Sequence, residues 1–383
     1  MLATGGTVNG VAFARHMHLL AVASNGLQLW DPVTYQPLST MQTIRGAVPE
    51  AVAFDPRSQS MATGDSDGSV RLWTYSEAGG LAADGRPLRG VAHGQTETVA
   101  YSPDGQLLAS GGDDGTVRLW NVSGPPRQLT ILPAFGAAVF SVAFSPDGEI
   151  LAAGSASGTI RLWDIASRAN PVPLSVLAGP ASTVYSVAFS PDGALLAAGS
   201  ADRNVYLWDV ASPRHPVRDG PALTGPASYV YALAFSPDGQ MLAAGSTDDT
   251  VWIWTLSGAP TLYATLTGPT AYVFAVAFSP QGHTLAVGSA DGTVRLWDTD
   301  PVAAMGGICA AAGTPISPEE WSRYVPGIPY APPCAQAGSN DGPYVKPSTN
   351  ALQTQGLLDR KRPVPDPVLA RRRHVIDVSV PPY

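Results

Sequence analysis

The sequence has few cysteines, few charged residues and no long apolar run. Only 2 of its 383 residues are cysteines, and charged residues make up 14% of the chain. Two cysteines cannot cross-link a chain of this size, so the burial of apolar side chains must stabilise the fold. No apolar stretch reaches the roughly 18 residues that span a bilayer, and the N-terminus lacks the basic start and apolar stretch of a secretory signal. We therefore expect a cytoplasmic protein without a membrane span.

Positive charge is also scarce. The formal net charge is −8, from 22 basic and 30 acidic residues. Residues 335–383 contain seven basic and four acidic residues, which leaves a net charge of −11 for the rest of the chain. A surface of that sign does not attract a phosphate backbone or an anionic membrane. We expect no nucleic acid as a partner of the main domain.

Catalytic and metal-binding motifs are missing as well. The chain contains no G-x-x-x-x-G-K-[ST] phosphate loop and no G-x-S-x-G nucleophile elbow. Its six histidines share no metal-ligand spacing, and none lies close to a cysteine in the sequence. The sequence therefore nominates no catalytic residue, no cofactor site and no metal site.

Glycine and proline, by contrast, are abundant. The 40 glycines and 36 prolines accompany 45% hydrophobic residues, which is typical of a chain with many turns around a core. Each of seven repeated phrases, such as VAFSPDGALLAAGSADRNVYLWD at 187–209, contains a tryptophan at or near its end. These tryptophans recur at intervals of 43 to 47 residues: Trp30, Trp73, Trp120, Trp163, Trp208, Trp254 and Trp297. Such a period indicates a repeat architecture in which the tryptophans are structural.

Each copy of the repeat predicts four short strands. In the fifth copy the apolar run 184–189 meets a Ser-Pro-Asp-Gly turn at 190–193, and strands over 195–200 and 204–209 follow. A weaker outer strand with prolines follows the tryptophan, as at 173–177 in the fourth copy. Aspartates between the second and third strands are expected to form turns: Asp67, Asp114, Asp202, Asp248 and Asp291. Sheets that are apolar on both faces must lie between neighbours, so seven of them close into a ring.

These phrases resemble the WD-repeat family of β-propellers over about residues 8–300. The resemblance implies an all-β, seven-bladed propeller of four-stranded antiparallel blades at residues 1–300, acting as a non-catalytic protein-interaction scaffold. The family usually has a Gly-His pair before the first strand, and that histidine joins a hydrogen-bond network with the turn aspartate. This chain instead has Gly-Pro at 179–180, 225–226 and 268–269. We expect the network to be broken there, with rigidity supplied by proline and packing.

Closure of the ring needs an outer strand for the last blade. Counting back from Thr7 leaves too little chain for that strand. Two sources are open, the segment after Asp298 or an upstream part of a longer chain. Residues 1–6 (MLATGG) look like the second strand of a lost repeat, as in MLAAGS at 241–246, which favours a truncated chain.

The residues just before the first strand point, in this family, onto the face that partners usually occupy. Blades one to three have Asn9, Glu50 and Glu97 there. Blades four to seven have six aromatic residues at or near this place: Phe140, Tyr185, Tyr229, Tyr231, Tyr272 and Phe274. Two interpretations are open: the rings pack beneath the proline loops in place of the lost histidines, or they bind a protein or peptide. The six aromatics, with Glu50 and Glu97, are the candidate partner-binding residues.

Residues 301–334 break the period and form a separate capping extension. Ser317, a proline and two glutamates predict a short helix near 317–324, in which Trp321 is structural. This segment resembles the C-terminal extension of actinobacterial WD-repeat proteins, which are often the sensor ends of large signalling NTPases of the STAND class. The resemblance implies the sensor or ligand-binding part of a bacterial signalling protein.

The two cysteines flank the helix of the extension. Cys309 and Cys334 either form a disulfide that ties the extension down or stay reduced, as a cytosolic chain would keep them. The Pro-rich, locally basic tail at 335–383 is predicted to be disordered.

Two other functions are open. One is a hydrolase-like enzyme that uses the central channel of the propeller, although the sequence lacks an inward set of His, Glu and Arg that would support it. The other is a fragment of a larger WD-repeat protein with no function alone.

Overall fold

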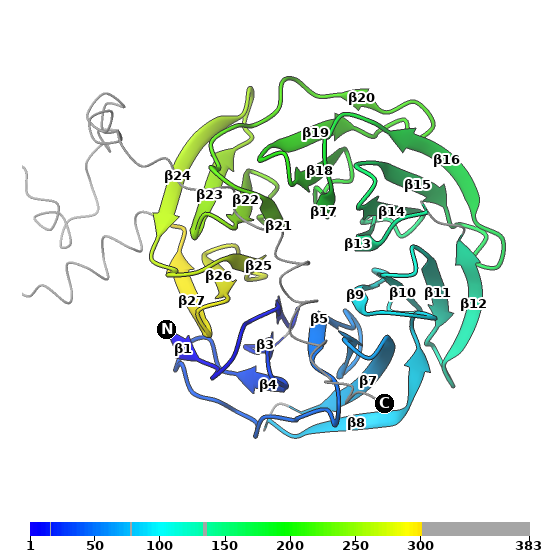
Figure 1. The fold of residues 1–383 in the computed structure, drawn as a ribbon, viewed down its shortest axis with the longest axis vertical. Helices are drawn as coiled ribbons and strands as arrows, with labels where there is room; N and C mark the ends of the chain where they lie inside the picture. Colours follow the sequence, from blue (N-terminus) through cyan, green and yellow to red (C-terminus); the bar gives the residue numbers. More distant parts are fainter. Residues whose placement is uncertain (16, 77–78, 133–135, 301–383) are drawn as a thin grey trace, which may run out of the picture. The chain divides into compact units, whose positions relative to one another are not determined.

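The computed structural model describes residues 1–15, 17–76, 79–132 and 136–300, which belong to one compact unit. These residues form strands and loops, without a helix, and the strands make seven antiparallel sheets arranged as a ring (Figure 1). The predicted all-β, seven-bladed propeller is confirmed. The predicted extension with Trp321, Cys309 and Cys334, and the tail after it, lie outside the described residues.

Five blades have four consecutive strands, ordered from the innermost to the outermost. Blade two consists of β5 (Pro49–Phe54), β6 (Ser60–Asp65), β7 (Ser69–Tyr75) and β8 (Leu81–Arg89). Blade three consists of β9 (Thr96–Tyr101), β10 (Leu107–Gly112), β11 (Val117–Asn121) and β12 (Arg127–Leu132). Blade four consists of β13 (Val139–Phe144), β14 (Ile150–Ser155), β15 (Ile160–Asp164) and β16 (Val172–Leu177).

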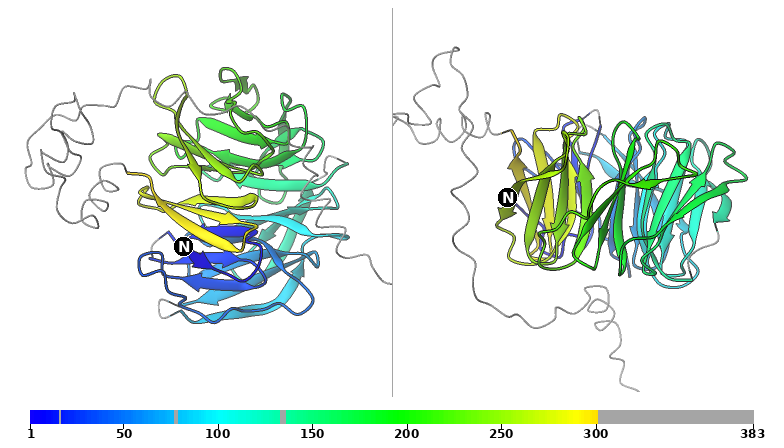
Figure 2. Two further views of the ribbon diagram at one scale, coloured as in Figure 1. Left: turned by 60° about the vertical axis from the view of Figure 1, so that its left-hand side comes forward. Right: turned by 90° about the horizontal axis from the view of Figure 1, so that it is seen from above.

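Blades five and six follow the same order. Blade five consists of β17 (Val184–Phe189), β18 (Leu195–Ser200), β19 (Val205–Asp209) and the short β20 (Val217–Arg218). Blade six consists of β21 (Val230–Phe235), β22 (Met241–Ser246), β23 (Thr250–Thr255) and β24 (Thr261–Thr267). In both side views of Figure 2 the strands of each blade run between the two ends of the ring.

Blade one has three strands rather than the expected four. It consists of β2 (Gly10–Phe13), β3 (Leu20–Ala23) and β4 (Leu27–Trp30). The chain beside β4 forms isolated bridges with it at Pro37 and Gln42 rather than a continuous ladder. The N–H of Leu38 donates to the carbonyl of Leu29 at 2.8 Å. The hydroxyl of Ser39 accepts a hydrogen bond of 2.9 Å from the backbone N–H of Leu29.

The last blade is closed by the N-terminus. It consists of β25 (Val273–Phe278), β26 (Thr284–Ser289), β27 (Thr293–Asp298) and, as its outer strand, β1 (Leu2–Ala3). Leu2 is opposite Val294 in the pairing, and the N–H of Thr4 donates to the carbonyl of Gly292 at 2.9 Å. The expectation that the segment after Asp298 supplies this strand was wrong, as was the comparison of residues 1–6 with a second strand, because Leu2–Ala3 occupy the outer position. So short a strand carries no repeat pattern.

The core lies between neighbouring blades, because each sheet is apolar on both faces. The repeat tryptophans pack against the preceding blade: Trp208 of blade five, for example, shares a cluster with Ile160 and Leu162 of blade four. Six of the seven tryptophans are no more than 7% exposed, and Trp297 is half-buried. Small residues of the second strands, such as Ala197 and Ala198, are fully buried, which lets the sheets approach closely.

Candidate partner-binding face

The inner strands of six blades contain a β-bulge at one matching residue. In blade five, for example, Val184 is opposite Ser200 and Ser186 is opposite Gly199, so that the register shifts at Tyr185. The bulge residues are Glu50, Glu97, Phe140, Tyr185, Tyr231 and Phe274. Asn9 occupies the matching place just before the first pair of β2. A bulge re-aims its side chain, and we call these seven residues the bulge ring.

The bulge ring lies at one end of the propeller. Each inner strand begins near its bulge residue and ends at its Ser-Pro-Asp-Gly or equivalent turn, as β17 does at Ser190. We therefore call the two ends the bulge end and the turn end. The turns between second and third strands, with their aspartates, also belong to the bulge end, because the second strand runs back toward it.

The structure brings the six candidate aromatic residues into one contiguous row. The ring centroids of Phe140 and Tyr185 are 5.1 Å apart, those of Tyr185 and Tyr231 are 4.7 Å apart, and those of Tyr231 and Phe274 are 4.8 Å apart. Tyr229 lies 6.1 Å from Tyr185, and Tyr272 lies 6.0 Å from Phe274. These distances are typical of favourable aromatic pairs. We call these six residues the aromatic row.

The members of the aromatic row differ in exposure. Tyr185 is 3% exposed and Phe274 is 7% exposed, whereas the other four are half-buried. The rings therefore pack on one another across neighbouring blades. This arrangement supports a packing role for Tyr185 and Phe274, and it leaves part of the remaining rings at the surface.

Hydroxyl groups next to the bulge residues link the inner strands of neighbouring blades. Thr98 accepts a hydrogen bond of 3.2 Å from the N–H of Val142 in the next blade. Ser141 and Ser186 accept equivalent bonds from Val187 at 3.0 Å and from Leu233 at 3.1 Å. The links run without interruption from blade three to blade six. The sequence signal was a Ser or Thr directly after the bulge residue in three successive repeats, and our sequence analysis missed it.

The remaining part of the bulge ring is polar. Glu50, Glu97 and Asn9 are half-buried, and the Nδ2 of Asn9 donates to the carbonyl of Pro49 in the next blade at 3.1 Å. The bulge ring thus contains two carboxylates, one amide and four aromatic side chains, and no basic residue.

The turn aspartates hold the loops that lead into the inner strands. In blade five Asp202 accepts a bond from the N–H of Asn204 at 3.1 Å, which makes the expected turn, and one from the N–H of Ala181 at 2.7 Å. The same loop contact occurs at Asp114, Asp248 and Asp291. The expected loss of the loop contact of the aspartate was wrong for blades five, six and seven, which have the Gly-Pro pairs. In these three blades the backbone N–H directly after the proline takes the place of the histidine side chain.

Side chains of the third strand complete this network. Arg118 and Arg295 form ion pairs of 2.8 Å with Asp114 and Asp291. In blade five the hydroxyl of Tyr206 donates to Asp202 instead, at 2.7 Å. Burial opposes ionisation of Asp114, but the bonds from Arg118, the loop backbone and a threonine outweigh it and lower its pKa to about 2.

Blade two differs from the other blades, because it has a buried carboxylate, Asp65, in this network. Asp65 occupies the position of Ser200 in blade five, and its side chain is completely buried. Burial raises its pKa to about 6, although Arg71 contacts it at 2.5 Å. Arg71 is shared with Asp67 at 2.8 Å, and the Oδ1 of Asp65 has no hydrogen-bond partner.

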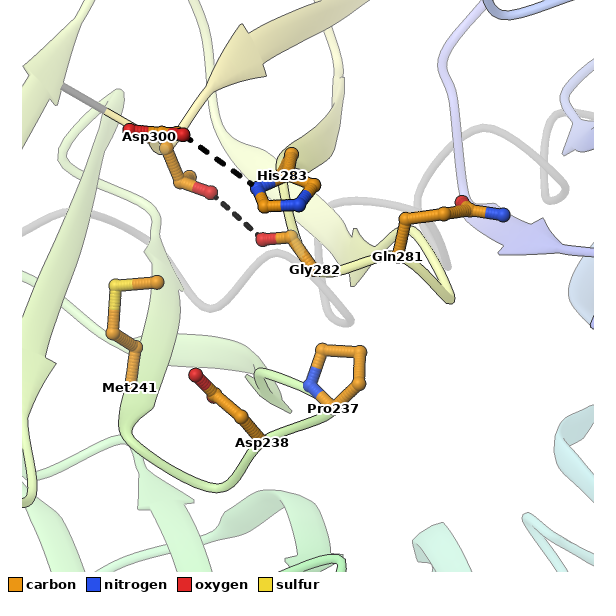
Figure 3. A pocket seen from close by; sticks show the side chains of 8 residues that line it. Pro237, Asp238, Met241, Gln281, Gly282, His283 and Asp300 are labelled. Atoms are coloured by element: carbon orange, nitrogen blue, oxygen red, sulfur yellow. Dashed lines mark hydrogen bonds and ion pairs between the residues drawn. The ribbon is translucent and has the colours of Figure 1, made fainter. Parts of the chain in front are cut away.

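A pocket of about 410 Å³ lies at the turn end, between blades six and seven. Figure 3 shows Asp238 and Met241 on one side of it and His283 and Asp300 on the other. The Nδ1 of His283 is 4.0 Å from the Asp300 carboxylate, and the imidazole is 67% exposed. Among the described residues, no three His, Cys, Asp or Glu side chains are grouped so that they could hold a metal ion. We take the bulge end as the candidate site because the aromatic row lies there.

The repeats match a known family model. The model described as "WD domain, G-beta repeat" matches residues 37–74, 86–121, 126–164, 171–209, 220–255 and 260–298. The chain belongs to the WD-repeat family. Each matched segment ends in the third strand of a blade and so contains its tryptophan. Membership of this WD-repeat family supports a protein-interaction scaffold.

Of the two other comparisons, the one with solved structures agrees with the fold. No curated protein matches the chain. A chain of the solved structure "Crystal Structure of Mitotic Checkpoint Complex" is similar, with a TM-score of 0.67 and 20% sequence identity. The similarity covers 78% of this chain and 90% of that chain, and at this identity it shows the fold alone. The described residues include no helix that could cross a membrane.

Proposed function

We propose that this protein is a non-catalytic scaffold that binds a protein or peptide at the bulge end. The aromatic row is the observation that supports this proposal. Tyrosine and phenylalanine rings bury a large apolar area and lose little conformational freedom, and a few such anchors commonly dominate an interface. Phe140 and Tyr231 are the two half-buried members of the row that also belong to the bulge ring.

The inner-strand links make the site rigid before a partner arrives. The bonds to Thr98, Ser141 and Ser186 fix four successive inner strands relative to one another. A preorganised site loses less entropy on binding, so more of the contact energy appears as affinity.

A sensor role in bacterial signalling is the finer part of this proposal. It is supported by the propeller together with the sequence of 301–334, which resembles the extension of actinobacterial WD-repeat proteins. The proposal places the protein in the cytoplasm. The reading frame upstream of Met1 tests it: a signalling NTPase encoded in that frame would support the sensor role, and an unrelated upstream gene would weaken it.

The binding site is tested by selecting peptides from a random display library on the full chain. Peptides retained by the wild type should be lost on Phe140→Ala with Tyr231→Ala. The control variant is Tyr35→Ala with Tyr263→Ala, which removes two rings that are 48% and 44% exposed outside the aromatic row. Equal retention by the Phe140/Tyr231 variant, at an unchanged melting temperature, would contradict the proposal.

A further inference from the structure

We infer that the outer edge of β27 in blade seven binds an extended peptide as an added antiparallel strand, with a basic residue opposite Asp298 and a leucine two residues further on. This site is on the outer edge of a blade and not at the bulge end, so the inference goes beyond the proposed function and does not depend on it. Three observations support it: the unpaired part of β27, the strands that cover this edge in other blades, and the charge beside it.

Part of the outer edge of β27 has no strand beside it. The short β1 pairs with Thr293 and Val294 (Figure 1), and among the described residues no strand pairs with β27 on that side beyond Val294. Leu296 and Trp297 are half-buried there, whereas the matching residues of blades three to six are no more than 5% exposed. An uncovered strand edge with apolar side chains is a template for a further strand.

The backbone groups of Leu296 and Asp298 point to the open side. Leu29 of blade one matches Leu296, and its carbonyl accepts a hydrogen bond of 2.8 Å from the N–H of Leu38 in the outer segment. Every second residue of an antiparallel strand bonds to the same neighbour, so Asp298 faces the same way as Leu296. Within the described part of the chain, neither residue has a backbone bond on that side.

Three other blades have a leucine at the corresponding place in their outer segment. These residues are Leu38 in blade one, Leu129 in blade three and Leu174 in blade four. Each packs against the core between its own blade and the next. The core between blades seven and one contains Trp30 and, at its margin, the half-buried Leu296. A leucine in the added strand would therefore cover Leu296.

The charge beside the open edge favours a basic residue at the start of the peptide. The side chain of Asp298 is exposed, and Asp238 and Asp300 line the pocket at the same end of β27 (Figure 3). No arginine or lysine is among the described residues that line this pocket. The outer strand of blade three has Arg127 at the matching place, opposite Asn121. An arginine opposite Asp298 would in addition gain the attraction of its carboxylate.

The test uses the capped peptide Arg-Gln-Leu-Thr, which repeats residues 127–130 of blade three. Nuclear magnetic resonance titration of the labelled full chain measures its binding, and hydrogen exchange at the amides of Leu296 and Asp298 should slow when it is added. Methylation of the leucine nitrogen removes the N–H that would donate to Leu296 and should weaken binding about tenfold. Methylation of the glutamine nitrogen, whose N–H points away from β27, is the matched control and should change binding little.

The contribution of charge is measured by replacing the arginine of the peptide with citrulline, which keeps its shape. We expect the arginine peptide to bind about threefold more tightly, because an exposed ion pair contributes little. Asp298→Asn should remove this preference. Asp209→Asn changes the matching aspartate of blade five, where β20 covers the edge, and should keep it.

Equal binding of the two methylated peptides, or no binding of any peptide, would overturn the inference. Loss of binding in Phe140→Ala with Tyr231→Ala would overturn it too, because the peptide would then occupy the bulge end, and the proposed function would stand. Slow exchange at Leu296 before any peptide is added would mean that a second copy or another part of the chain already covers the edge, which also contradicts the inference.

Discussion

Blades two and five contain the same bulge in their inner strands but place very different side chains there. The ladder skips Glu50 in blade two and Tyr185 in blade five, with the same shift of register. Apolar residues and tight turns build the sheet in both blades, and the ladder between the first two strands skips the bulge residue. The fold therefore provides equivalent positions around one end, and the sequence makes four of them aromatic and two acidic. The aromatic side chains also pack on one another across blades.

The largest expected effect separates these two kinds of bulge position. Tyr185→Ala removes a ring that is 3% exposed and contacts Phe140, Tyr229 and Tyr231. We expect it to lower the free energy of unfolding by about 3 kcal/mol. Glu50→Ala, at the matching half-buried position, removes less buried apolar area and should lower it by less than Tyr185→Ala does. Urea unfolding measures both, and a similar small loss in each variant would show that the row does not stabilise the ring.

The pH dependence of stability should distinguish blade two from blade five. In the folded chain the pKa of Asp65 is raised from 3.8 to about 6, so the folded state binds this proton more tightly than the unfolded state. Between those values stability increases as the pH falls, and at neutral pH the buried charge is a cost. Asp65→Ser, which restores the residue of blade five, should raise stability at pH 7.5 by about 2 kcal/mol relative to its effect at pH 4.5.

Chemical unfolding at pH 4.5, 6 and 7.5 checks this expectation. Asp114 and Asp291, whose pKa values are lowered to about 2, stay ionised throughout that range. They therefore do not contribute to the pH dependence of stability between pH 4.5 and 7.5. A stability difference between wild type and Asp65→Ser that is the same at all three pH values would show that Asp65 does not titrate in this window.

The repeat made most of the fold predictable from the sequence. A period near 45 residues, two apolar faces and Ser-Pro-Asp-Gly turns leave few alternatives to a seven-bladed ring. The strand Leu2–Ala3 was not predictable, because two residues have no pattern and their partner, Val294, is distant in the sequence. The loop contacts were missed for another reason. A backbone N–H such as that of Ala181 can replace a histidine side chain, but every residue except proline has one, so the sequence does not indicate this contact.

The site was only partly predictable. The sequence placed Phe140, Tyr185 and Tyr231 at matching positions, but it did not show that they stack on one another. Ring contacts across blades depend on the closure of the propeller, which no single repeat contains. The inner-strand links were hidden because Ser and Thr are ordinary residues in a strand, and their partners are 44 to 47 residues away.

A smaller effect is expected from one of these links. Ser186→Ala removes the acceptor for the N–H of Leu233 and should cost about 1 kcal/mol. Blades six and seven have Ala232 and Ala275 at the matching positions, so they lack this bond. Amide hydrogen exchange should increase at Leu233 in the variant. Unchanged hydrogen exchange at Leu233 and an unchanged free energy of unfolding would show that this bond between blades five and six does not stabilise the propeller.

The smallest effect concerns the tryptophans. In blades two and three the indole N–H donates to Thr63 and to Ser110, both at 3.0 Å. Blade seven has Val287 at the matching register, and the buried indole nitrogen of Trp297 has no hydrogen-bond partner. An unsatisfied buried donor is costly, so an acceptor placed there should stabilise the blade.

Val287→Thr keeps the shape of the side chain and supplies the missing hydroxyl. We expect a gain of about 0.5 kcal/mol in the free energy of unfolding, because the new bond must also offset the burial of that hydroxyl. Trp297→Phe is the control, since it removes the indole N–H. Combined with it, Val287→Thr should become destabilising, and this double-mutant cycle isolates the bond from other effects. A gain that persisted without the indole would mean that the hydroxyl bonds elsewhere, and that the tryptophan of blade seven differs from those of blades two and three for another reason.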